Sequence, residues 1–343
     1  MKFINLATIN AAGTSEKSLY GAISTDMFFG QLSNLEIRID KNSVAQYFTV
    51  SIPVIESLNF DTKKAILVEE CLKNALGNMA KIAETMPINA IEDLLVVTSA
   101  FEEQVLAKEQ WQSMVKASVS SLMPNFSEKI SFQYSKPDND NQEYTLSPYF
   151  NEQALIRPTL MLCVDVLTSY NHIKQLNQLV KIQHLDGPQG IMPAEGASCS
   201  LLLPEAFPLT KLEAAMNIST VKSDDGATRL SLSAQLSSLG FTYNSTIIHV
   251  GTLSQSWTKY WYAQTNDFYQ QAVKGNQGQM LLDQTRTLGY LGVANLPTAF
   301  ACAKAYLTSP MKENECVWVV EHSNSLAENA KPLSKVYKVK AMV

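Results

Sequence analysis

Residues 191–205 read IMPAEGASCSLLLPE, and this stretch decides the fold class. Its second part, GASCSLLL at 196–203, is a run of apolar and small residues with no charge. Such a run is typical of a strand buried on both faces of its sheet. Because a strand of this kind needs helices on both faces, the stretch indicates an α/β protein.

Short apolar runs alternate with helical patterns along the rest of the chain. LMLCVDVL at 160–167 predicts a second buried strand, and the apolar spacing in 62–85 predicts an amphipathic helix capped by Thr62. Further strands are expected at 2–10, 93–98, 213–221, 245–250 and 316–321, and further helices at 102–123, 149–156, 172–182, 228–239, 257–273 and 297–307. The order of elements predicts two similar halves, 1–205 and 206–343, without a residue-level repeat.

The composition is that of an ordinary globular protein, with 46% of the 343 residues apolar and 17% charged. The net charge is −5 and there is no basic block, which argues against nucleic-acid binding. No run approaches the roughly 18 apolar residues of a membrane span, and the N-terminus lacks the apolar segment of a signal peptide. Five scattered cysteines without a CxxC pair fit a reducing compartment. We therefore expect a cytoplasmic protein with no membrane span.

Five segments are similar, in chain order, to segments of the β-ketoacyl synthases and thiolases. They are LATINAAGTSEKSLYGAIS (6–24), LMLCVDVL (160–167), IMPAEGASCSLLLPE (191–205), IIHVGTLS (247–254) and TRTLGYLGVANLPTAFACA (285–303). The third, the best match, resembles the family's Glu–Gly–Ala–Ala segment, which leads into a hydrophobic strand. The fourth resembles its His–Gly–Thr–Gly–Thr segment. The fifth resembles its Lys–Ser–x–x–Gly–His segment and the helix that follows.

This resemblance implies a thiolase-like α/β fold, with two similar βαβαβ-type halves packed as a layered α/β/α/β/α structure. It also implies a homodimer, or a heterodimer with a second thiolase-like protein, formed through a shared sheet edge. The chain is shorter than a typical ketosynthase, and the shortening falls before residue 160.

Ketosynthase chemistry needs an activated cysteine thiolate to take the acyl group. In the family that cysteine lies at a strand-to-helix turn ahead of the strand that resembles 160–167. The corresponding region here, 131–149, contains no cysteine. Ser135 is its nearest hydroxyl, but no Gly-x-Ser-x-Gly elbow surrounds it, and a solvated loop is expected over 135–143. Cys163 falls inside a predicted strand, so we expect it to be buried and inert.

Two positions of the family's active site keep hydrogen-bonding groups. His249 matches the first histidine, which would donate a hydrogen bond to a thioester oxygen. Tyr290 falls where the second histidine would be. A phenol with a pKa of about 10 is a poor general base at neutral pH. We treat both as vestigial candidates for catalysis, with ordinary packing as the alternative. Arg286 stands near the family's lysine, and Glu195 resembles a residue that shapes a turn and supports the sheet.

The other candidates have no companion groups at a suitable spacing. His172, His184 and His322 are lone histidines on separate predicted elements, so neither a metal nor a cofactor is expected. The aromatic run at 257–269 has helical spacing that brings Trp257, Trp261 and Phe268 close to one face. It is interpreted as core, or as a partner surface if part of it is exposed.

Two functions are therefore weighed. The first is a catalytically inactive ketosynthase-like protein, an accessory or scaffold subunit that pairs with another thiolase-fold chain or with a bacterial secretion effector. An acyl carrier protein is a further possible partner. The second is an active β-ketoacyl synthase or acyltransferase with a rearranged site and an unrecognised nucleophile.

Overall fold

The computed structural model describes most of the chain. The described residues are 1–38, 43–83, 91, 93–99, 108–126, 129–135, 157–179, 182–185, 190–207, 215–221, 232–251, 255–274, 281–310, 312–322 and 334–342.

Ten strands form one sheet, in the order β10-β9-β11-β12-β8-β1-β7-β6-β4-β5. Their bounds are β1 (Lys2–Ile9), β4 (Asp93–Ser99), β5 (Ile130–Ser135), β6 (Thr159–Val166), β7 (Glu195–Leu203), β8 (Met216–Val221), β9 (Thr246–Gly251), β10 (Leu281–Asp283), β11 (Cys316–His322) and β12 (Ser334–Ala341). The sheet consists of two sets of five strands. They meet where Lys2 and Phe3 of β1 pair with Asn217 and Met216 of β8.

Both sets follow the same order of pairing, β1-β7-β6-β4-β5 and β8-β12-β11-β9-β10. In the first set β7 is antiparallel to both of its neighbours, β1 and β6. In the second set β12 is likewise antiparallel to β8 and β11. The remaining pairs are parallel. The carboxyl ends of three parallel strands therefore lie together at one edge of each set.

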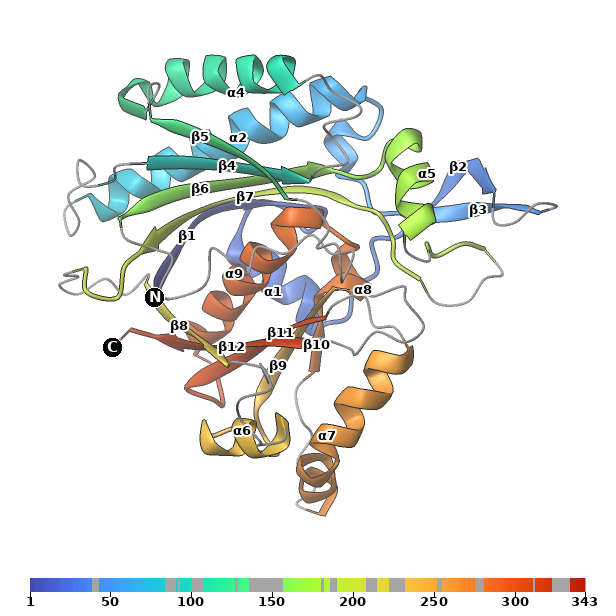
Figure 1. Cartoon of the computed structure of the whole chain (residues 1–343), viewed down its shortest axis with the longest axis vertical. Coiled ribbons are helices and arrows are strands. Elements are labelled where there is room, and N and C mark those ends of the chain that lie inside the picture. The colour runs from blue at the N-terminus through green and yellow to red at the C-terminus, as the bar shows by residue number, and fades with distance from the viewer. Residues whose placement is uncertain are drawn as a thin grey trace.

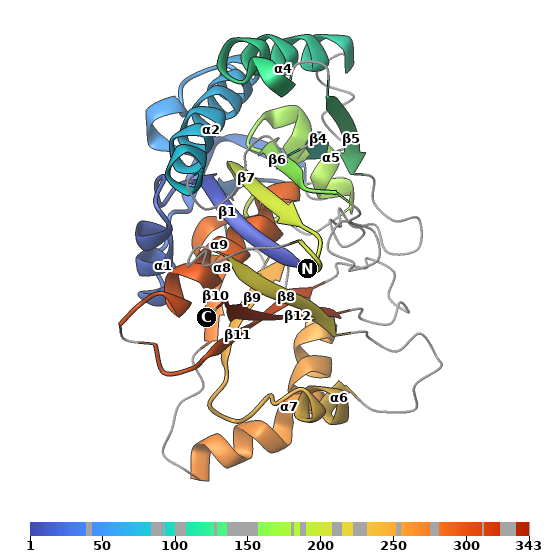
Figure 2. The ribbon, with the colours of Figure 1, turned by 90° about the vertical axis from the view of Figure 1, so that its left-hand side faces the viewer.

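Helices form three layers around the two sets of strands (Figures 1 and 2). The bounds are α1 (Glu16–Ser24) and α9 (Asn295–Leu307) between the sets, α2 (Phe60–Ile82) and α4 (Lys108–Leu122) outside the first, and α6 (Leu232–Ser238) and α7 (Gln255–Lys274) outside the second. The expected layered α/β architecture is therefore confirmed.

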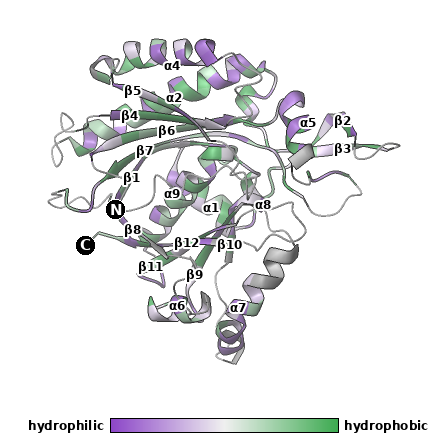
Figure 3. Ribbon diagram, in the orientation of Figure 1, coloured by the Kyte–Doolittle hydropathy of each residue, from purple (hydrophilic) through white to green (hydrophobic). Residues whose placement is uncertain are grey.

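Three hydrophobic clusters fill the spaces between these layers. The central cluster contains Phe3, Met161, Ile248 and Phe300, from both sets of strands and from α9. One outer cluster lies beneath α2 and α4, and another lies beneath α6 and α7. Green and purple residues alternate along α2 and α4 in Figure 3, as expected for helices with one buried face.

A small two-stranded sheet of β2 (Gln31–Arg38) and β3 (Val44–Thr49) lies beside α5 (Tyr170–Leu179). The remaining elements are short: α8 (Gln284–Leu288) and the 3₁₀ turns η1 (Pro53–Ile55), η3 (Pro124–Phe126) and η4 (Gly292–Ala294).

Most of the expected elements are present. The strands expected at 2–10, 93–98, 160–167, 196–203, 213–221, 245–250 and 316–321 are β1, β4, β6, β7, β8, β9 and β11, and the helices expected at 62–85, 102–123, 172–182, 228–239, 257–273 and 297–307 are α2, α4, α5, α6, α7 and α9. The helix expected at 149–156 lies outside the described residues. The predicted cap of α2 was wrong, because Asn59 Oδ1 accepts the N–H of Thr62 at 2.9 Å. The elements that the sequence did not predict are α1, α8, β2, β3, β5, β10 and β12.

The first strand carries an irregularity that polar side chains stabilise. Leu6 is an extra residue between Asn5, which pairs with Ser200, and Ala7, which pairs with Cys199. Asn78 Nδ2 on α2 donates to the carbonyl oxygen of Leu6 at 2.6 Å. A bulge leaves a backbone group without a ladder partner, and the Asn78 amide supplies one here.

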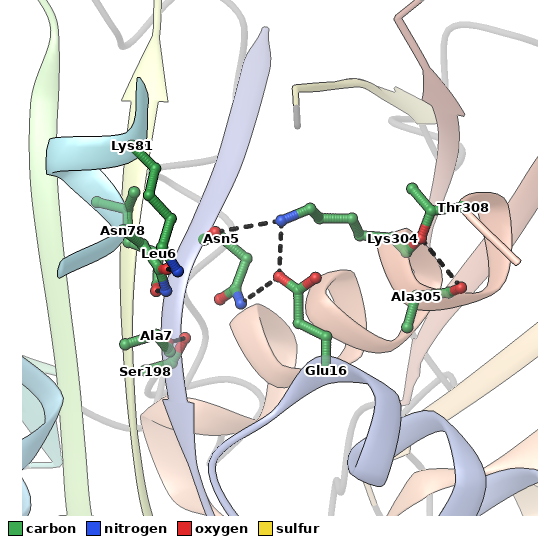
Figure 4. A network of polar contacts seen from close by, with 10 residues as sticks. All are labelled: Asn5, Leu6, Ala7, Glu16, Asn78, Lys81, Ser198, Lys304, Ala305 and Thr308. Atoms are coloured by element: carbon green, nitrogen blue, oxygen red, sulfur yellow. Dashed lines mark hydrogen bonds and ion pairs between the residues drawn. The ribbon is translucent and has the colours of Figure 1, made fainter. Parts of the chain in front are cut away.

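On the other side of β1, three side chains join the central helices to the strand (Figure 4). Glu16 Oε1 on α1 accepts from Asn5 Nδ2 at 2.7 Å and from Lys304 Nζ on α9 at 2.8 Å. This network therefore connects β1, α1 and α9.

Candidate functional site

The place where a nucleophile is expected lies at the carboxyl edge of the first set of strands. There β4, β5 and β6 run parallel, and Ser99 at the end of β4 pairs with Ser135 at the end of β5. Ligands of open α/β sheets bind at such an edge. Of the loop expected over 135–143, Ser135 belongs to β5 instead. The side chain of Ser135 and residues 136–156 lie outside the described part of the chain.

All five cysteines lie inside helices or strands, and none lies at a turn. Cys71 is on α2, Cys163 on β6, Cys199 on β7 and Cys302 on α9, all buried, and the half-buried Cys316 begins β11. Burial raises the pKa of every one of these thiols, to about 12 for Cys199. Since the thiolate is the reactive form, none of these cysteines is activated. The buried position expected for Cys163 is confirmed.

At this same edge the carboxylate of Asp165 holds together β4, β6 and η4. Its Oδ1 accepts the backbone N–H of Ser99 at 2.9 Å and the hydroxyl of Thr98 at 3.2 Å. Its Oδ2 accepts the backbone N–H of Val293 at 2.7 Å. Gly292 has a φ of +57°, and a Cβ there would lie 1.9 Å from Asp165 Oδ2. Only glycine therefore lets the chain come this close to the carboxylate.

Lys64 of α2 is the cation associated with this carboxylate. The side chain is fully buried, and its Nζ donates to Thr98 Oγ1 at 2.9 Å. The same Nζ lies 3.8 Å from the ring centroid of Trp111, a favourable position for a cation. Burial lowers the pKa of Lys64 to about 7, although Asp165 and Asp61 oppose that shift. Burial also raises the pKa of Asp165, and Lys64 opposes that shift.

A buried ion pair lies next to Lys64, at the neighbouring residue of α2. Lys63 Nζ lies 2.9 Å from Glu195 Oε2, and the same carboxylate accepts the N–H of Ile52 at 2.7 Å and the hydroxyl of Thr168 at 2.8 Å. Glu195 therefore connects α2, β7, the residue before η1 and the turn after β6. These contacts agree with the expected role of Glu195 in supporting the sheet. Glu195 is the first residue of β7, however, and the turn lies before it.

His249 lies on the outer face of the second set of strands. Its neighbours Ile248 and Val250 belong to the central cluster, so its side chain points the opposite way, to α7. There its ring lies perpendicular to that of Trp261, at a centroid distance of 5.6 Å. Burial lowers the pKa of His249 to about 4, so the imidazole is neutral at neutral pH.

Tyr290 packs elsewhere. Its ring lies against the cluster beneath α5 and the small sheet, and its N–H donates to the carbonyl oxygen of Met192 at 2.7 Å. Arg286 is exposed and forms a surface ion pair with Asp26 at 3.2 Å. That His249 and Tyr290 are vestigial catalytic residues stays a prediction.

The other predicted candidates are dispersed. His172 is buried beneath α2, and His184 Nδ1 lies 3.0 Å from the carbonyl oxygen of Leu185. The side chains of His322 and Trp257 are outside the described part. Trp261 and Phe268 both pack against Phe241, as expected for a core face of α7. Over the described ranges, no group of three or more His, Cys, Asp or Glu residues could hold a metal ion. No helix there is long and apolar enough to span a membrane.

The substitution Gly292→Ala should destabilise the fold by about 3 kcal/mol or more, because the methyl group displaces the Asp165 carboxylate and forces a left-handed residue. Urea unfolding measures this loss. Gly21→Ala in α1 is the matched control, since a Cβ there meets nothing within 4 Å. A Gly292→Ala protein as stable as the control would contradict the close approach to Asp165.

Lys64 should give the stability a distinctive pH dependence. Its pKa is about 7 in the folded chain, against an ordinary value of 10.5, so between these values the unfolded chain binds one more proton. The free energy of unfolding should therefore rise with pH, by up to about 1.4 kcal/mol per pH unit. Urea unfolding from about pH 7 to about pH 9 should show this rise in the wild type and lose it in Lys64→Met. Lys81→Met on the same helix is the control and should keep the wild-type slope; parallel wild-type and Lys64→Met curves would refute the assignment.

No family model and no curated protein matches the sequence, whereas solved structures with the same fold do. A chain of the complex between a type II polyketide synthase acyl-carrier protein and its ketosynthase gives a TM-score of 0.55 at 11% identity, over 99% of both chains. A β-ketoacyl synthase from Burkholderia phymatum STM815 gives 0.53 at 11% identity, over 100% of both chains. The ishigamide ketosynthase/chain length factor gives 0.50 at 13% identity, over 100% of this chain and 99% of the other. The chain therefore has the thiolase-like fold of ketosynthases and chain length factors.

Proposed function

We propose that this chain is a catalytically inactive ketosynthase-like protein. It serves as an accessory or scaffold subunit that pairs with another thiolase-fold chain or with a bacterial secretion effector. The observation that carries this proposal is the state of its thiols. All five lie within regular elements, and burial raises the pKa of each. A condensing enzyme needs the opposite, an accessible thiol with a lowered pKa.

Two further observations support the loss of condensing chemistry. His249 points to α7, on the side of its sheet away from the central helices, and Tyr290 packs in another cluster. The region from 131 to 149, in which the family carries its nucleophile, contains neither cysteine nor histidine. The fold is thus kept while the groups that would perform the reaction are dispersed or missing.

The two sets of strands also bear on how the chain is built. We propose that residues 1–205 and 206–343 are two similar halves, as the repeated order of strand pairing supports. Each half then contributes five strands and at least one of the central helices, α1 or α9. The contact between halves at Asp165 and Val293 becomes the point that sets their relative position.

The edge strand β5 is the surface that we assign to pairing. It ends the ten-stranded sheet, its sequence ISFQYS has neither charge nor proline, and the strand at the other end, β10, has three residues. Soluble proteins usually protect an open edge with charged residues or proline. Within the described ranges β5 pairs only with β4 and carries neither, which fits a strand that another chain covers. Phe132 and Tyr134 are half-buried against the sheet, while Ser131 and Gln133 are exposed.

The partner follows from this edge and from the structural neighbours. One neighbour is a ketosynthase/chain length factor and another comes from a ketosynthase complex with an acyl-carrier protein. For this chain we favour a second thiolase-like protein, as a homodimer or heterodimer. A carrier protein or a secretion effector is a further partner of the same assembly.

Alkylation of the native protein tests the inactive state directly. Excess iodoacetamide at neutral pH should modify no cysteine to stoichiometry within minutes, because all five thiols are protonated and at least half-buried. Intact-mass spectrometry measures this, and the urea-unfolded protein is the control that should take up five labels. Rapid modification of one native cysteine, or its acylation by an acyl-CoA, would overturn the proposal.

Charged residues on the edge strand should disrupt the assembly. The double substitution Ser131→Lys and Gln133→Lys places two charges beside the backbone that a partner strand would bind. Light scattering should show an assembly for the wild type, alone or with its copurified companion, and a monomer for the variant. Asn217→Lys with Ser219→Lys makes the same change at two exposed positions on the inner strand β8 and should leave the assembly intact. A wild-type monomer without a companion would contradict the accessory role.

A further inference from the structure

Two buried polar side chains of the central layer face each other across a pair of strands. Asn5 of β1 pairs directly with Ser200 of β7, and the two residues are only 5% and 0% exposed. Side chains of directly opposed residues lie on the same face of a sheet, with their Cβ atoms about 4.5–5.5 Å apart. The Asn5 amide and the Ser200 hydroxyl therefore lie close together in the interior.

The orientation of the Asn5 amide is fixed by a carboxylate. Its Nδ2 donates to Glu16 Oε1 at 2.7 Å (Figure 4), and an ionised carboxylate can only accept, so the bonded amide atom is the nitrogen. The other amide atom, Oδ1, is therefore an acceptor. Among the described residues neither Asn5 Oδ1 nor Ser200 Oγ has a hydrogen-bond partner, although both atoms are shielded from solvent. An acceptor and a hydroxyl thus lie near each other without bonding to each other.

The neighbouring serine of the same strand shows how a hydroxyl in this layer is normally satisfied. Ser198 is fully buried on the same face of β7, and its Oγ donates to the carbonyl oxygen of Ala7 at 3.3 Å. Ser200 instead lies opposite the last residue before the bulge at Leu6, where the pairing of β1 with β7 shifts. Buried polar side chains nearly always have a partner, either in the protein or in an ordered water. Ser200 therefore needs a partner that the protein does not supply.

The charged groups beside the pair determine which kind of partner fits. Lys304 Nζ lies 2.8 Å from Glu16 Oε1 and 3.5 Å from the carbonyl oxygen of Asn5, so the two charges already neutralise each other. A buried ion needs a countercharge of its own, and this argues for a neutral molecule. Two hydrogen bonds of about 2.8 Å through one water span up to about 5.5 Å between oxygens. A single water thus fits both the charge balance and the spacing of opposed side chains.

We propose that the central layer binds one internal water molecule between Asn5 Oδ1 and Ser200 Oγ. The water donates a hydrogen bond to Asn5 Oδ1 and accepts one from the Ser200 hydroxyl. It thereby extends the network of Glu16 and Lys304 from β1 to β7, next to the bulge. This binding site lies away from the thiols and from the edge strand β5, so it does not depend on the accessory role.

A high-resolution crystal structure of the full chain tests the site directly. The electron density should show one peak at about 2.8 Å from both Asn5 Oδ1 and Ser200 Oγ. A structure without that peak would overturn the inference, and so would one in which the Ser200 hydroxyl bonds directly to Asn5.

The variant Ser200→Ala measures the contribution of the water in solution. A water bridge is nearly as strong as a direct hydrogen bond, so its loss should lower the folding equilibrium constant about fivefold in urea unfolding. Ser198→Ala is the matched control, because it makes the same change on the same face of β7 and removes a direct bond. The two variants should lose stability by similar factors.

An unpartnered buried hydroxyl has the opposite effect, since it destabilises the fold and its removal does not. A folding equilibrium constant of Ser200→Ala equal to or above that of the wild type would therefore contradict the bound water. If this variant does not fold, the wild-type crystal structure still decides. Neither measurement bears on the accessory role, which thiol alkylation and light scattering test separately.

Discussion

The described structure depends most on the buried carboxylate of Asp165. It accepts backbone N–H groups from Ser99 at the end of β4 and from Val293 in η4, residues 194 positions apart. A buried charge is tolerated only when its acceptor sites are filled and a countercharge is near. Thr98 and Lys64 meet this requirement, and Gly292 leaves the space that the carboxylate needs. The carboxylate therefore fixes where the segment before α9 meets the first set of strands.

This constraint also explains why α2 carries two buried lysines at its start. Lys63 pairs with Glu195 and Lys64 reaches Asp165 through Thr98, so one turn of helix serves the ends of two neighbouring strands. Both lysine stems cross the apolar layer beneath α2 to reach the polar edge. Removing Glu195 would leave Lys63 buried without its ion-pair partner, and removing Asp165 would leave Lys64 without the carboxylate nearby, which makes both carboxylates hard to substitute singly.

The sequence predicted the elements whose burial pattern is unambiguous. The apolar runs of β6 and β7, in which Asp165 and Glu195 are the only charged residues, and the 3.6-residue spacing of α2 predicted these elements. Charge is rare in a strand covered on both faces, and apolar residues keep to one face of a helix. β2, β3 and β12 were not predicted: SKVYKVKA of β12 has three lysines, β2 is mostly exposed and β3 is mostly half-buried. Short α8 and β10 have too few residues to show a period.

The candidate site was harder to predict than the fold. The resemblance to ketosynthases identified His249. Only the packing of its neighbours Ile248 and Val250 shows on which face of β9 its side chain lies. Asp165 lies within the predicted strand 160–167 and Lys64 within the predicted helix 62–85, but neither was predicted as a site residue. A signal for Lys64 was present, since it lies on the same helical stripe as Leu67, Val68 and Cys71, where a charge has to be paired. Contacts between residues far apart in the chain, such as Asp165 with Val293, leave no trace in local spacing.

The position of β1 in the middle of the sheet has a consequence for the synthesis of the chain. β1 leaves the ribosome before β7 and β8, the strands with which it pairs, and the nitrogen of Met1 donates to the carbonyl oxygen of Ile218, 217 residues later. Both edges of β1 therefore stay unpaired until β7 and β8 have been synthesised, and closing such long loops slows folding. An apolar strand with two open edges is prone to aggregate during that delay. The nascent chain should thus depend on chaperones until β7 and β8 have emerged.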